Sequence, residues 1–526
     1  MKMTKEQKYR LLEEAAIEEI QQLESLVHQS RWRQGYHIQP HIGLLNDPNG
    51  FTFYNGKYHL FYQWFPLGTD HGMKYWYHLV SSDLAHWEDA GIGLEPGGTY
   101  DSHGAYSGSG IEKDGKLYLM YTGNTRDEQW IRHPYQCLAV TDGEGLAQKI
   151  EPPVIESVPT GYTEHFRDPK VWKDGTDYRC VIGAQRENLT GTAVLYRSPD
   201  LVNWTFEGEL QTSLPSFGYM WECPDYFELD DAGILLFCPQ GLAPENEKFR
   251  NIYQSGYLLG EPLASDGQYF SHGEFIELDY GFDFYAPQTT LGADGERILV
   301  GWMGVPDLEY PTDSHGWAHC LTLPRELSVH QGKLIQRPAA GLKSLRGKKV
   351  PFAAQLINQH RSFQGVEGTS YELEFSICPI AENSAIDETD TFEEGVFGIE
   401  FRTGDMERTV LFYDASNGLI TLDRSQSGAA CSTEFGTTRS YTRNPDQLGQ
   451  SITFRIFVDT SSVEIFVGDG EATFTARLFP DSASTGISFF AIGGSADFEG
   501  AFWQLDSDGI SRELPAEIRQ RAKKTE

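Results

Sequence analysis

The stretch NGKYHLFYQW at residues 55–64 joins a glycine-centred turn to a hydrophobic, aromatic-rich segment that is typical of a β-strand. The same element returns as DGKLYLMYTG from Asp114, DGTDYRCVIGA from Asp174, DAGILLFCPQG from Asp231 and DGERILVGWMG from Asp294. Successive starts are separated by 59, 60, 57 and 63 residues. A nearly constant period of this length indicates a repeat architecture in which each unit packs on its neighbours.

A second element keeps the same period. SSDLAHW contains Asp83, TDGEGL contains Asp142 and SPDLVNW contains Asp200, offset from one another by 59 and 58 residues. Five units of about four short strands cannot each bury their own faces, and radial packing in a β-propeller buries all of them together. The alternative is an ordinary β-sandwich or barrel whose hairpins resemble one another by chance. Because two separate elements share one period, the sequence favours a five-bladed propeller.

The pattern changes after Arg337. Segments such as SYELEFSI from Ser370 and GISFFAIGG from Gly486 alternate apolar and polar residues between tight turns. This alternation is typical of an antiparallel β-sandwich of ordinary domain size. The acidic stretch that begins at Ala381 predicts a surface loop.

Residues 4–30 carry apolar side chains at helical spacing, which predicts an amphipathic helix docked on the body. The predicted fold class is therefore all-β: a five-bladed β-propeller followed by a β-sandwich, with a short N-terminal α-helix. The predicted parts are an N-terminal helical extension at 1–31, the propeller at 32–340, the sandwich at 350–510 and a C-terminal tail at 511–526.

The charge balance restricts the partners. The chain has 526 residues, with 76 acidic against 42 basic side chains and a formal net charge of −34. This charge argues against nucleic acid and an anionic membrane as partners. No segment is long and apolar enough to span a bilayer, and the N-terminus lacks the shape of a signal peptide. We therefore expect a cytoplasmic protein.

Cysteine and histidine spacing gives no sign of a bound metal. The seven cysteines are scattered and never form a CxxC pair, so we expect reduced thiols rather than disulfides or a zinc site. The 15 histidines show no ligand spacing such as HExxH, and no glycine-rich loop precedes a helix. The expected cofactor is none. Self-association into a homo-oligomer through the sandwich stays open.

A carboxylate lies just upstream of the turn in three of the five units. Asp47 lies in LLNDPNG, Asp168 in FRDPK and Glu222 in WECPDYF, whereas the other two units carry YSGSG and FYAPQ. The innermost strands of a propeller line a central channel, so equivalent positions of different blades point at one site. Three carboxylates in an aromatic-rimmed pocket suit glycoside cleavage, in which one acid is ionised and another is protonated.

Neighbouring residues add two expectations about these acids. Pro48 and Pro169 bias Asp47 and Asp168 toward an extended backbone, because a proline disfavours helical conformations in the residue before it. Trp221 and Cys223 are expected to surround Glu222 with apolar groups. Such surroundings would raise the pKa of Glu222 and suit it to donate a proton.

These motifs resemble those of a known family. HIGLLNDPNG, FRDPK and WECPD are similar to three signature boxes of glycoside hydrolase family 32, and FYQW, YSGSG, FYAPQ and RIFVDTSSVEIFV match further boxes, from about Tyr36 to Leu505. The family joins a five-bladed β-propeller to a β-sandwich. The resemblance implies hydrolysis of a small sugar with a terminal β-D-fructofuranosyl group (sucrose, sucrose 6-phosphate or a short fructan), with retention of configuration through a fructosyl-enzyme intermediate.

The resemblance also implies roles for individual residues. Asp47 would be the nucleophile and Glu222 the acid/base, while Asp168 would hold the fructosyl hydroxyls through charge-assisted hydrogen bonds. Arg167 beside Asp168 would bind substrate, keep that acid ionised, or do both. The implied substrate-binding residues are Asn46, Gln63, Trp76, Tyr106, Ser107, Arg167, Tyr285 and Trp302.

One loop departs from the commoner family pattern. Several members carry a Trp-Gly where this chain has HGMKYW from His71, a form that resembles the bacterial intracellular sucrose-6-phosphate hydrolase branch, as does GNTRDEQWIRHPYQC from Gly123. Our hypothesis is a basic patch in the leaving-group subsite that recognises a 6-phosphate. Its candidates are His71, Lys74 and Arg126, with Arg132 and His133. The alternative is that these are exposed loop charges that balance nearby acids.

Three other functions fit parts of this pattern. The first is an inverting five-bladed glycosidase of another specificity, such as one that cleaves arabinan. The second is a fructosyltransferase, in which a sugar instead of water captures the covalent intermediate. The third is a catalytically inactive sugar-binding propeller, and acids on three inner strands argue against it.

Overall fold

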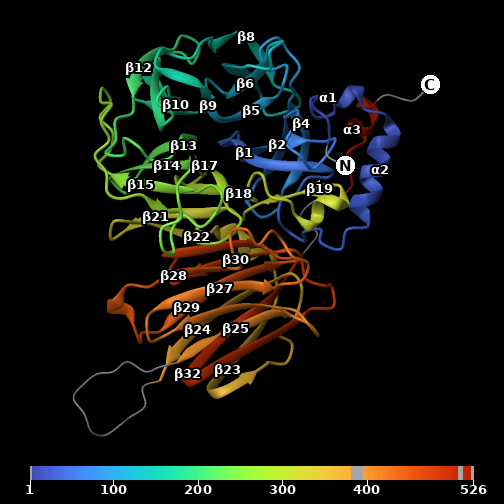
Figure 1. Cartoon of the computed structure of the whole chain (residues 1–526), viewed down its shortest axis with the longest axis vertical. Helices are drawn as coiled ribbons and strands as arrows, with labels where there is room; N and C mark the ends of the chain where they lie inside the picture. Colours follow the sequence, from blue (N-terminus) through green and yellow to red (C-terminus); the bar gives the residue numbers. More distant parts are fainter. Residues whose placement is uncertain (1–2, 381–394, 507–512, 523–526) are drawn as a thin grey trace.

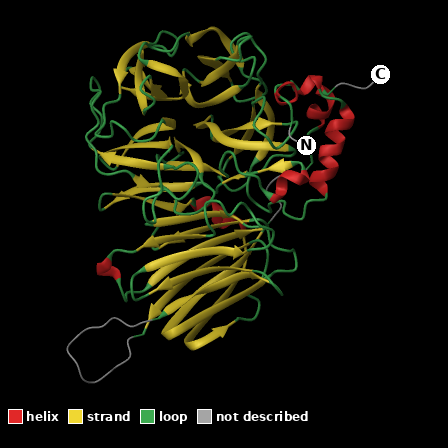
Figure 2. Cartoon of the chain, in the orientation of Figure 1, coloured by secondary structure: helices red, strands yellow, loops and turns green. Residues whose placement is uncertain are grey.

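The computed structural model describes residues 3–380, 395–506 and 513–522, and it shows two stacked bodies (Figure 1). The upper body holds five small sheets, and the lower body is one large sheet folded on itself; nearly all the regular structure is strand (Figure 2). Most of the acidic stretch that begins at Ala381, where a surface loop is predicted, lies outside the described residues.

The upper body is a five-bladed propeller, as the repeat predicts. Four blades are the sheets β1–β4, β5–β8, β9–β12 and β13–β16, and the fifth is built on β17, β18, β21 and β22. The innermost strands are β1 (Gly43–Tyr54), β5 (Ala105–Lys113), β9 (Tyr162–Asp174), β13 (Met220–Leu229) and β17 (Tyr285–Leu291). Each contacts the next, and β17 returns to β1, so the five strands form a closed ring.

The outer strands complete each blade. The second strands are β2 (Lys57–Phe65), β6 (Lys116–Arg126), β10 (Asp177–Arg186), β14 (Ala232–Gln240) and β18 (Arg297–Met303). Third and fourth strands are β3 (Tyr75–Ser81), β4 (Glu88–Leu94), β7 (Arg132–Thr141), β8 (Gln148–Ile155), β11 (Gly191–Ser198), β12 (Thr205–Glu209), β15 (Gly256–Gly260), β16 (Ile276–Glu277), β21 (Arg325–His330) and β22 (Lys333–Pro338). Two short strands, β19 (Trp317–Ala318) and β20 (Cys320–Leu321), pair with β1 and β18, so a late segment also supports the first blade.

The quoted repeat marks the turn between the first and second strands of a blade. Asn55 and Gly56 both have positive φ, at 49° and 79°, and so do Asp114 and Gly115, at 53° and 73°. Two successive residues with positive φ form the tight turn whose twist matches an antiparallel hairpin, and Asn-Gly and Asp-Gly are the residue pairs that adopt it most readily. The repeat therefore marks the hairpin between the first and second strands, which occurs once in each blade.

The lower body is a β-sandwich made from one continuous sheet. Its strands follow the order β28-β27-β26-β25-β32-β24-β29-β30-β31, and β23 pairs with β32. The long strand β32 (Gly486–Leu505) pairs with β23, β24 and β25 and so joins the two layers. The remaining bounds are β23 (Arg346–Arg361), β24 (Tyr371–Pro379), β25 (Val396–Thr403), β26 (Arg408–Asp414), β27 (Leu419–Gln426), β28 (Thr438–Thr442), β29 (Ile452–Asp459), β30 (Ser462–Val467) and β31 (Ala472–Arg477).

The three α-helices of the described ranges gather beside the first blade, where both ends of the described chain meet (Figure 1). They are α1 (Lys5–Lys8), α2 (Ile17–His28) and α3 (Ala516–Arg521). One helix was expected across residues 4–30, but it is interrupted because Leu12 is buried against the blade and donates its backbone N–H to the Tyr75 hydroxyl at 2.8 Å. No helix in the described ranges is long and apolar enough to cross a membrane. The four predicted segment boundaries stay predictions.

A buried polar network joins the two bodies. His37 contacts Asp459 through Nδ1 at 2.8 Å and Glu464 through Nε2 at 3.1 Å. Arg325 pairs with the same Glu464 at 2.7 Å and with Asp279 at 3.1 Å. Burial alone would lower the pKa of His37, but its hydrogen bonds to two carboxylates outweigh burial and raise that pKa to about 9. His37 therefore stays protonated in the folded protein at neutral pH.

This raised pKa predicts a pH-dependent contribution to stability. A group whose pKa rises on folding from 6.5 to about 9 stabilises the fold fully below pH 6.5 and loses that contribution as the pH rises through 9. The full effect is on the order of 3 kcal/mol. We expect His37→Gln to lower the melting temperature much more at pH 6 than at pH 9.5. The same substitution at the exposed His330 should change neither value, and an equal loss at both pH values for His37→Gln would contradict this explanation.

Candidate active site

All five innermost strands carry a β-bulge at the same level. In each strand two residues face a single residue of the second strand and stay unpaired: 46–47 in β1, 106–107 in β5, 168–169 in β9, 223–224 in β13 and 286–287 in β17. A bulge removes residues from the ladder and redirects their side chains. The five bulges thus bring side chains from all five blades to one mouth of the central channel.

The three predicted acids occupy three different positions relative to these bulges. Glu222 is the last paired residue before its bulge, Asp168 is the first unpaired residue of its own, and Asp47 is the second. Residues in matching positions contact one another: Ser107 matches Asp47, while Arg167 and Tyr285 match Glu222. The shared position explains why each acid has its own set of partners.

The backbone at the bulges corrects one expectation. The prediction that Pro169 holds Asp168 in an extended conformation is wrong, because Asp168 has a φ of 68°. Cys223 and Ala286, the equivalent residues before Pro224 and Pro287, also have positive φ, at 50° and 48°. Hydrogen bonds stabilise this turn: the Asp168 N–H donates to Thr122 Oγ1 at 3.0 Å, and the Cys223 N–H donates to Asp168 Oδ2 at 3.0 Å.

Asp47 is surrounded by hydrogen-bond donors. The Ser107 hydroxyl donates to Asp47 Oδ2, and Asn46 Nδ2 donates to Oδ1 at 3.1 Å. Gln63 links both donors, and Lys74 Nζ donates to Asn46 Oδ1 at 2.6 Å. Burial raises the pKa of Asp47, while the hydrogen bonds from Ser107 and Asn46 and the charge of Lys74 oppose that rise. These donors favour the ionised carboxylate.

Glu222 has a different environment from the one expected. Arg167 donates from Nε at 3.0 Å and from Nη2 at 2.7 Å to Glu222 Oε1. Gln240 Nε2 and the Tyr285 hydroxyl donate to Oε2 at 2.7 Å and 2.6 Å. Trp221 instead packs in a hydrophobic core, with its indole N–H bonded to a backbone carbonyl. The expectation of apolar surroundings is therefore wrong: the carboxyl of Glu222 is held by a cation and two neutral donors.

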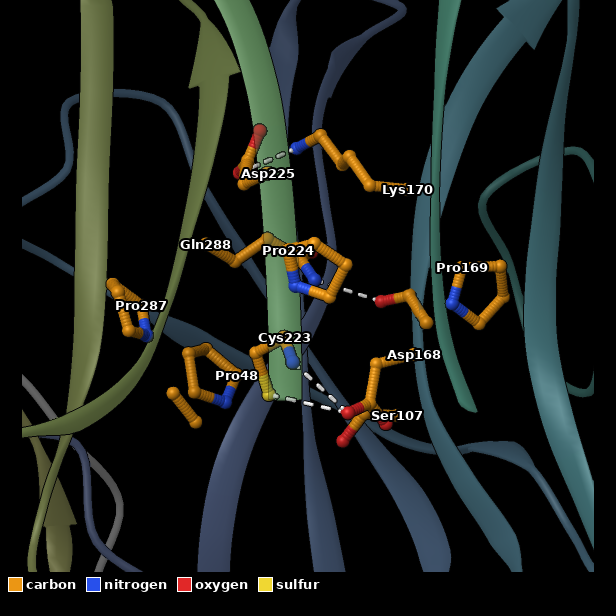
Figure 3. A pocket seen from close by; sticks show the side chains of 12 residues that line it. Pro48, Ser107, Asp168, Pro169, Lys170, Cys223, Pro224, Asp225, Pro287 and Gln288 are labelled. Atoms are coloured by element: carbon orange, nitrogen blue, oxygen red, sulfur yellow. Dashed lines mark hydrogen bonds and ion pairs between the residues drawn. The ribbon is translucent and has the colours of Figure 1, made fainter. Parts of the chain in front are cut away.

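Asp168 lies between these two acids. Its Oδ2 accepts the Cys223 N–H and contacts the Cys223 thiol at 3.7 Å, as Figure 3 shows, and the same sulfur contacts Asp47 Oδ2 at 3.7 Å. Arg167 makes its ion pair with Glu222 and not with Asp168. Burial raises the pKa of Asp168, the charge of Arg167 opposes this, and the carboxylates of Glu222 and Asp47 raise the pKa further. Three carboxyls in one site do not all ionise easily.

The channel is closed directly beneath the acids. Pro48, Pro169, Pro224 and Pro287 surround a space of about 10 Å³ there, below the volume that a sugar requires (Figure 3). On the far side of this space, Lys170 Nζ pairs with Asp225 Oδ2 at 2.9 Å and donates to a backbone carbonyl at 2.6 Å. The space beneath the acids is therefore too small for a sugar, whereas the cavity on their other side is large enough.

Above the acids lies a cavity of about 440 Å³. Twelve of the residues predicted from sequence line it, namely Asn46, Asp47, Gln63, His71, Lys74, Tyr106, Ser107, Arg167, Asp168, Glu222, Tyr285 and Trp302, together with Arg132 from the same hypothesis. Their roles stay predictions. Within the described ranges, no cluster of three His, Cys, Asp or Glu side chains is arranged to hold a metal ion.

Three candidates do not line the cavity. Trp76 is fully buried between two blades and donates its indole N–H to the Tyr106 carbonyl at 3.2 Å. Arg126 stands behind the cavity wall, with its guanidinium 5.7 Å from the Trp130 ring. His133 is nearly half exposed and pairs with Asp127. Trp76 and Arg126 therefore support residues of the wall and do not face the cavity.

Several lining residues were missed from sequence: Tyr9, Gly72, His165, Tyr219, Gln240, Tyr253, Pro306 and Asp307. A signal existed for His165, which lies two residues before Arg167 in the FRDPK box and contacts its Nη1 at 3.1 Å. No signal existed for Tyr9, because it comes from the N-terminal segment, far from any motif.

One wall of the cavity is cationic. Burial lowers the pKa of Lys74 to about 7, and burial with the charges of Arg167 and Arg132 lowers that of His165 to about 4. Burial and the charge of Lys74 also hold the pKa of His71 well below its ordinary value. At neutral pH both histidines are uncharged. The positive charge of this wall therefore comes mainly from Arg132 and Arg167.

Comparison with known proteins agrees with this architecture. The model of the glycosyl hydrolases family 32 N-terminal domain matches residues 37–338, and that of the family 32 C-terminal domain matches residues 341–504. A sucrose-6-phosphate hydrolase of Staphylococcus xylosus is 46% identical over 508 residues, covering 96% of this chain and 99% of that protein.

Solved structures give the same result. The structure of a sucrose-6-phosphate hydrolase from Lactobacillus gasseri has a TM-score of 0.87 and 34% identity, covering 96% of this chain and all of the other. A mutant of a Bombyx mori β-fructofuranosidase in complex with sucrose has a TM-score of 0.77 and 32% identity, covering 93% and 97%. Both family domains and the full-length relatives cover nearly the whole sequence. The chain therefore belongs to glycosyl hydrolase family 32.

Proposed function

We propose that the chain hydrolyses terminal β-D-fructofuranosides by a retaining mechanism in which Asp47 is the nucleophile and Glu222 the acid/base. The observation that carries this proposal is that carboxyls from three blades share one cavity, each with its own partners. Asp47 accepts hydrogen bonds from Ser107 and Asn46, and Glu222 accepts them from Arg167, Gln240 and Tyr285 of other strands. Family membership and the names of the relatives support the fructoside as substrate.

The first half-reaction breaks the glycosidic bond. The Asp47 carboxylate attacks the anomeric carbon of the fructosyl group while Glu222 transfers its proton to the departing sugar oxygen. Asp47 and Asp168 lie nearby, and their charges favour a proton on one member of the group. The products are the released sugar and an ester between Asp47 and the fructosyl group.

The second half-reaction releases fructose. Glu222, now ionised, accepts a proton from water as that water attacks the anomeric carbon, and Asp47 leaves as a carboxylate. Two inversions at one carbon give net retention. Asp168 holds fructosyl hydroxyls, and these hydrogen bonds strengthen as positive charge develops on the ring. Gln63 and Ser107 orient Asp47 through the hydrogen bonds already described.

The compartment and the assembly are further inferences. All seven cysteines, each within the described ranges, are free thiols. This agrees with a reducing compartment, and we propose the cytoplasm. Self-association through the sandwich stays a prediction.

A phosphorylated leaving group fits the cationic wall. The Arg132 guanidinium forms no hydrogen bond or ion pair with a described residue, and its buried Nε lacks a partner. It lies over the Tyr106 ring at 5.7 Å, at the edge of the cavity. An unpaired, partly buried cation is costly in a protein with a net charge of −34, where carboxylates are abundant. We propose that the phosphate of sucrose 6-phosphate is the missing partner, as the names of the relatives suggest.

Removal of the nucleophile tests the mechanism. We expect Asp47→Ala to lower kcat for sucrose and for sucrose 6-phosphate by at least about a thousandfold, because no other group can form the ester. The melting temperature should stay close to that of the parent, since the residue lies at the cavity and outside the hydrophobic cores. Asp142→Ala, at an exposed blade turn, serves as the control and should be fully active. Near-normal turnover in Asp47→Ala would reject the assignment.

Removal of the unpaired cation tests the phosphate. We expect Arg132→Met to lower kcat/KM for sucrose 6-phosphate by about 10- to 100-fold, the range for a hydrogen bond to a charged group, and to leave sucrose nearly unchanged. Arg408→Met removes a half-exposed arginine that pairs with Glu400 on the sandwich and is the matched control. Equal values for the two sugars in the parent protein, unaltered by Arg132→Met, would contradict phosphate recognition.

A further inference from the structure

The N-terminal segment, residues 3–31, covers the loop at residues 70–74 that forms one edge of the cavity. The Met73 N–H donates to the Lys8 carbonyl at 2.7 Å, and Lys8 Nζ pairs with Asp70 at 3.1 Å. A side chain at Gly72 would place its Cβ 2.4 Å from the Lys8 carbonyl oxygen, so only glycine permits this approach. The loop is therefore shaped by its contact with the N-terminal segment.

Tyr9 carries this segment into the cavity itself. It lines the same space as the three acids, and its ring packs edge-on against Trp130 at 5.6 Å and at a tilt against His103 at 5.2 Å. Tyr106 lines the same cavity. Burial raises the pKa of Tyr9, so the hydroxyl keeps its proton at neutral pH and can donate a hydrogen bond.

The Tyr9 side chain shares this region with cations that have no carboxylate partner among the described residues. Arg126 lies 5.7 Å from the Trp130 ring against which Tyr9 packs, and Arg132, which lines the cavity with Tyr9, lies 5.7 Å from the Tyr106 ring. Lys5, on the same segment, lies 4.7 Å from the Trp130 ring that supports Tyr9. A neutral donor among unpaired cations is suited to an anionic oxygen.

The position of Tyr9 is fixed by the other end of the chain. In α3, Arg521 pairs with Glu13 at 3.2 Å and with Glu95 of the first blade at 2.5 Å. Arg519 pairs with Glu24 of α2 at 2.7 Å, and Ile518 is fully buried. The N-terminal segment is thus clamped between α3 and the blade, which holds the tyrosine in place before substrate binds.

We propose that Tyr9 is a specificity-determining residue of the leaving-group subsite, where its hydroxyl donates a hydrogen bond to a phosphate oxygen on the departing sugar. This inference rests on the proposed function and extends it: the N-terminal segment, which lies outside both family domains, becomes part of the substrate cavity. The segment would then help to distinguish a phosphorylated disaccharide from a neutral one.

The test is Tyr9→Phe, which removes one hydroxyl and keeps the ring packing. We expect kcat/KM for sucrose 6-phosphate to fall about tenfold through a higher KM, while kcat/KM for sucrose changes less than about twofold. Inorganic phosphate, measured by calorimetry, should bind the variant about tenfold more weakly. Tyr269→Phe, at an exposed tyrosine outside the cavity, is the matched control and should leave every value unchanged.

The outcomes separate this inference from the proposed function. An unchanged ratio of the two kcat/KM values in Tyr9→Phe, or an equal loss for both sugars, overturns the role of Tyr9 while hydrolysis itself stands. A parent protein that cleaves neither sugar contradicts the proposed function. Even then, weaker phosphate binding by Tyr9→Phe would support the anion contact, and unchanged phosphate binding would overturn it.

Discussion

Radial packing of the blades is the constraint on which the site depends. A blade of four strands cannot bury both faces alone, so five blades close into a ring and the first strand of each must line the axis. The closed ring of β1, β5, β9, β13 and β17 is the direct result. Acids from three different blades then share one cavity, although more than 50 residues separate each from the next in sequence.

The bulges give each of the three acids a different position and different partners within the shared site. They place Glu222, Asp168 and Asp47 at three successive positions, so that each acid meets the side chains that share its position in adjacent blades. Asp47 meets Ser107, and Glu222 meets Arg167 and Tyr285. One geometric device thus gives the two carboxyls different partners, although both lie in the same cavity.

The sequence predicts the architecture well because the hairpin turn repeats in every blade, and it indicates the acids because each lies on the strand just before that turn, at a distance that varies from blade to blade. Predictions from the sequence are wrong where tertiary contacts determine the backbone conformation or the neighbours of a residue. Asp168 adopts a left-handed conformation against the preference imposed by Pro169, since the bulge and its hydrogen bonds outweigh that local bias. The carboxyl of Glu222 accepts hydrogen bonds from Arg167 and does not pack against Trp221, because residues of adjacent strands surround it and its sequence neighbours do not. Tyr9 gives no signal at all, since only the folded chain ends bring it to the cavity.

The central claim is that Asp47 forms a covalent bond to the fructosyl group and that Glu222 is needed to release it. Mass spectrometry of Glu222→Gln incubated with β-fructosyl fluoride tests this directly, because fluoride leaves without a proton donor while hydrolysis of the ester lacks its base. The protein is expected to become heavier by one fructosyl group, with the added mass on the peptide that contains Asp47. An unmodified protein, or a modified residue other than Asp47, would contradict the role of Asp47 as nucleophile.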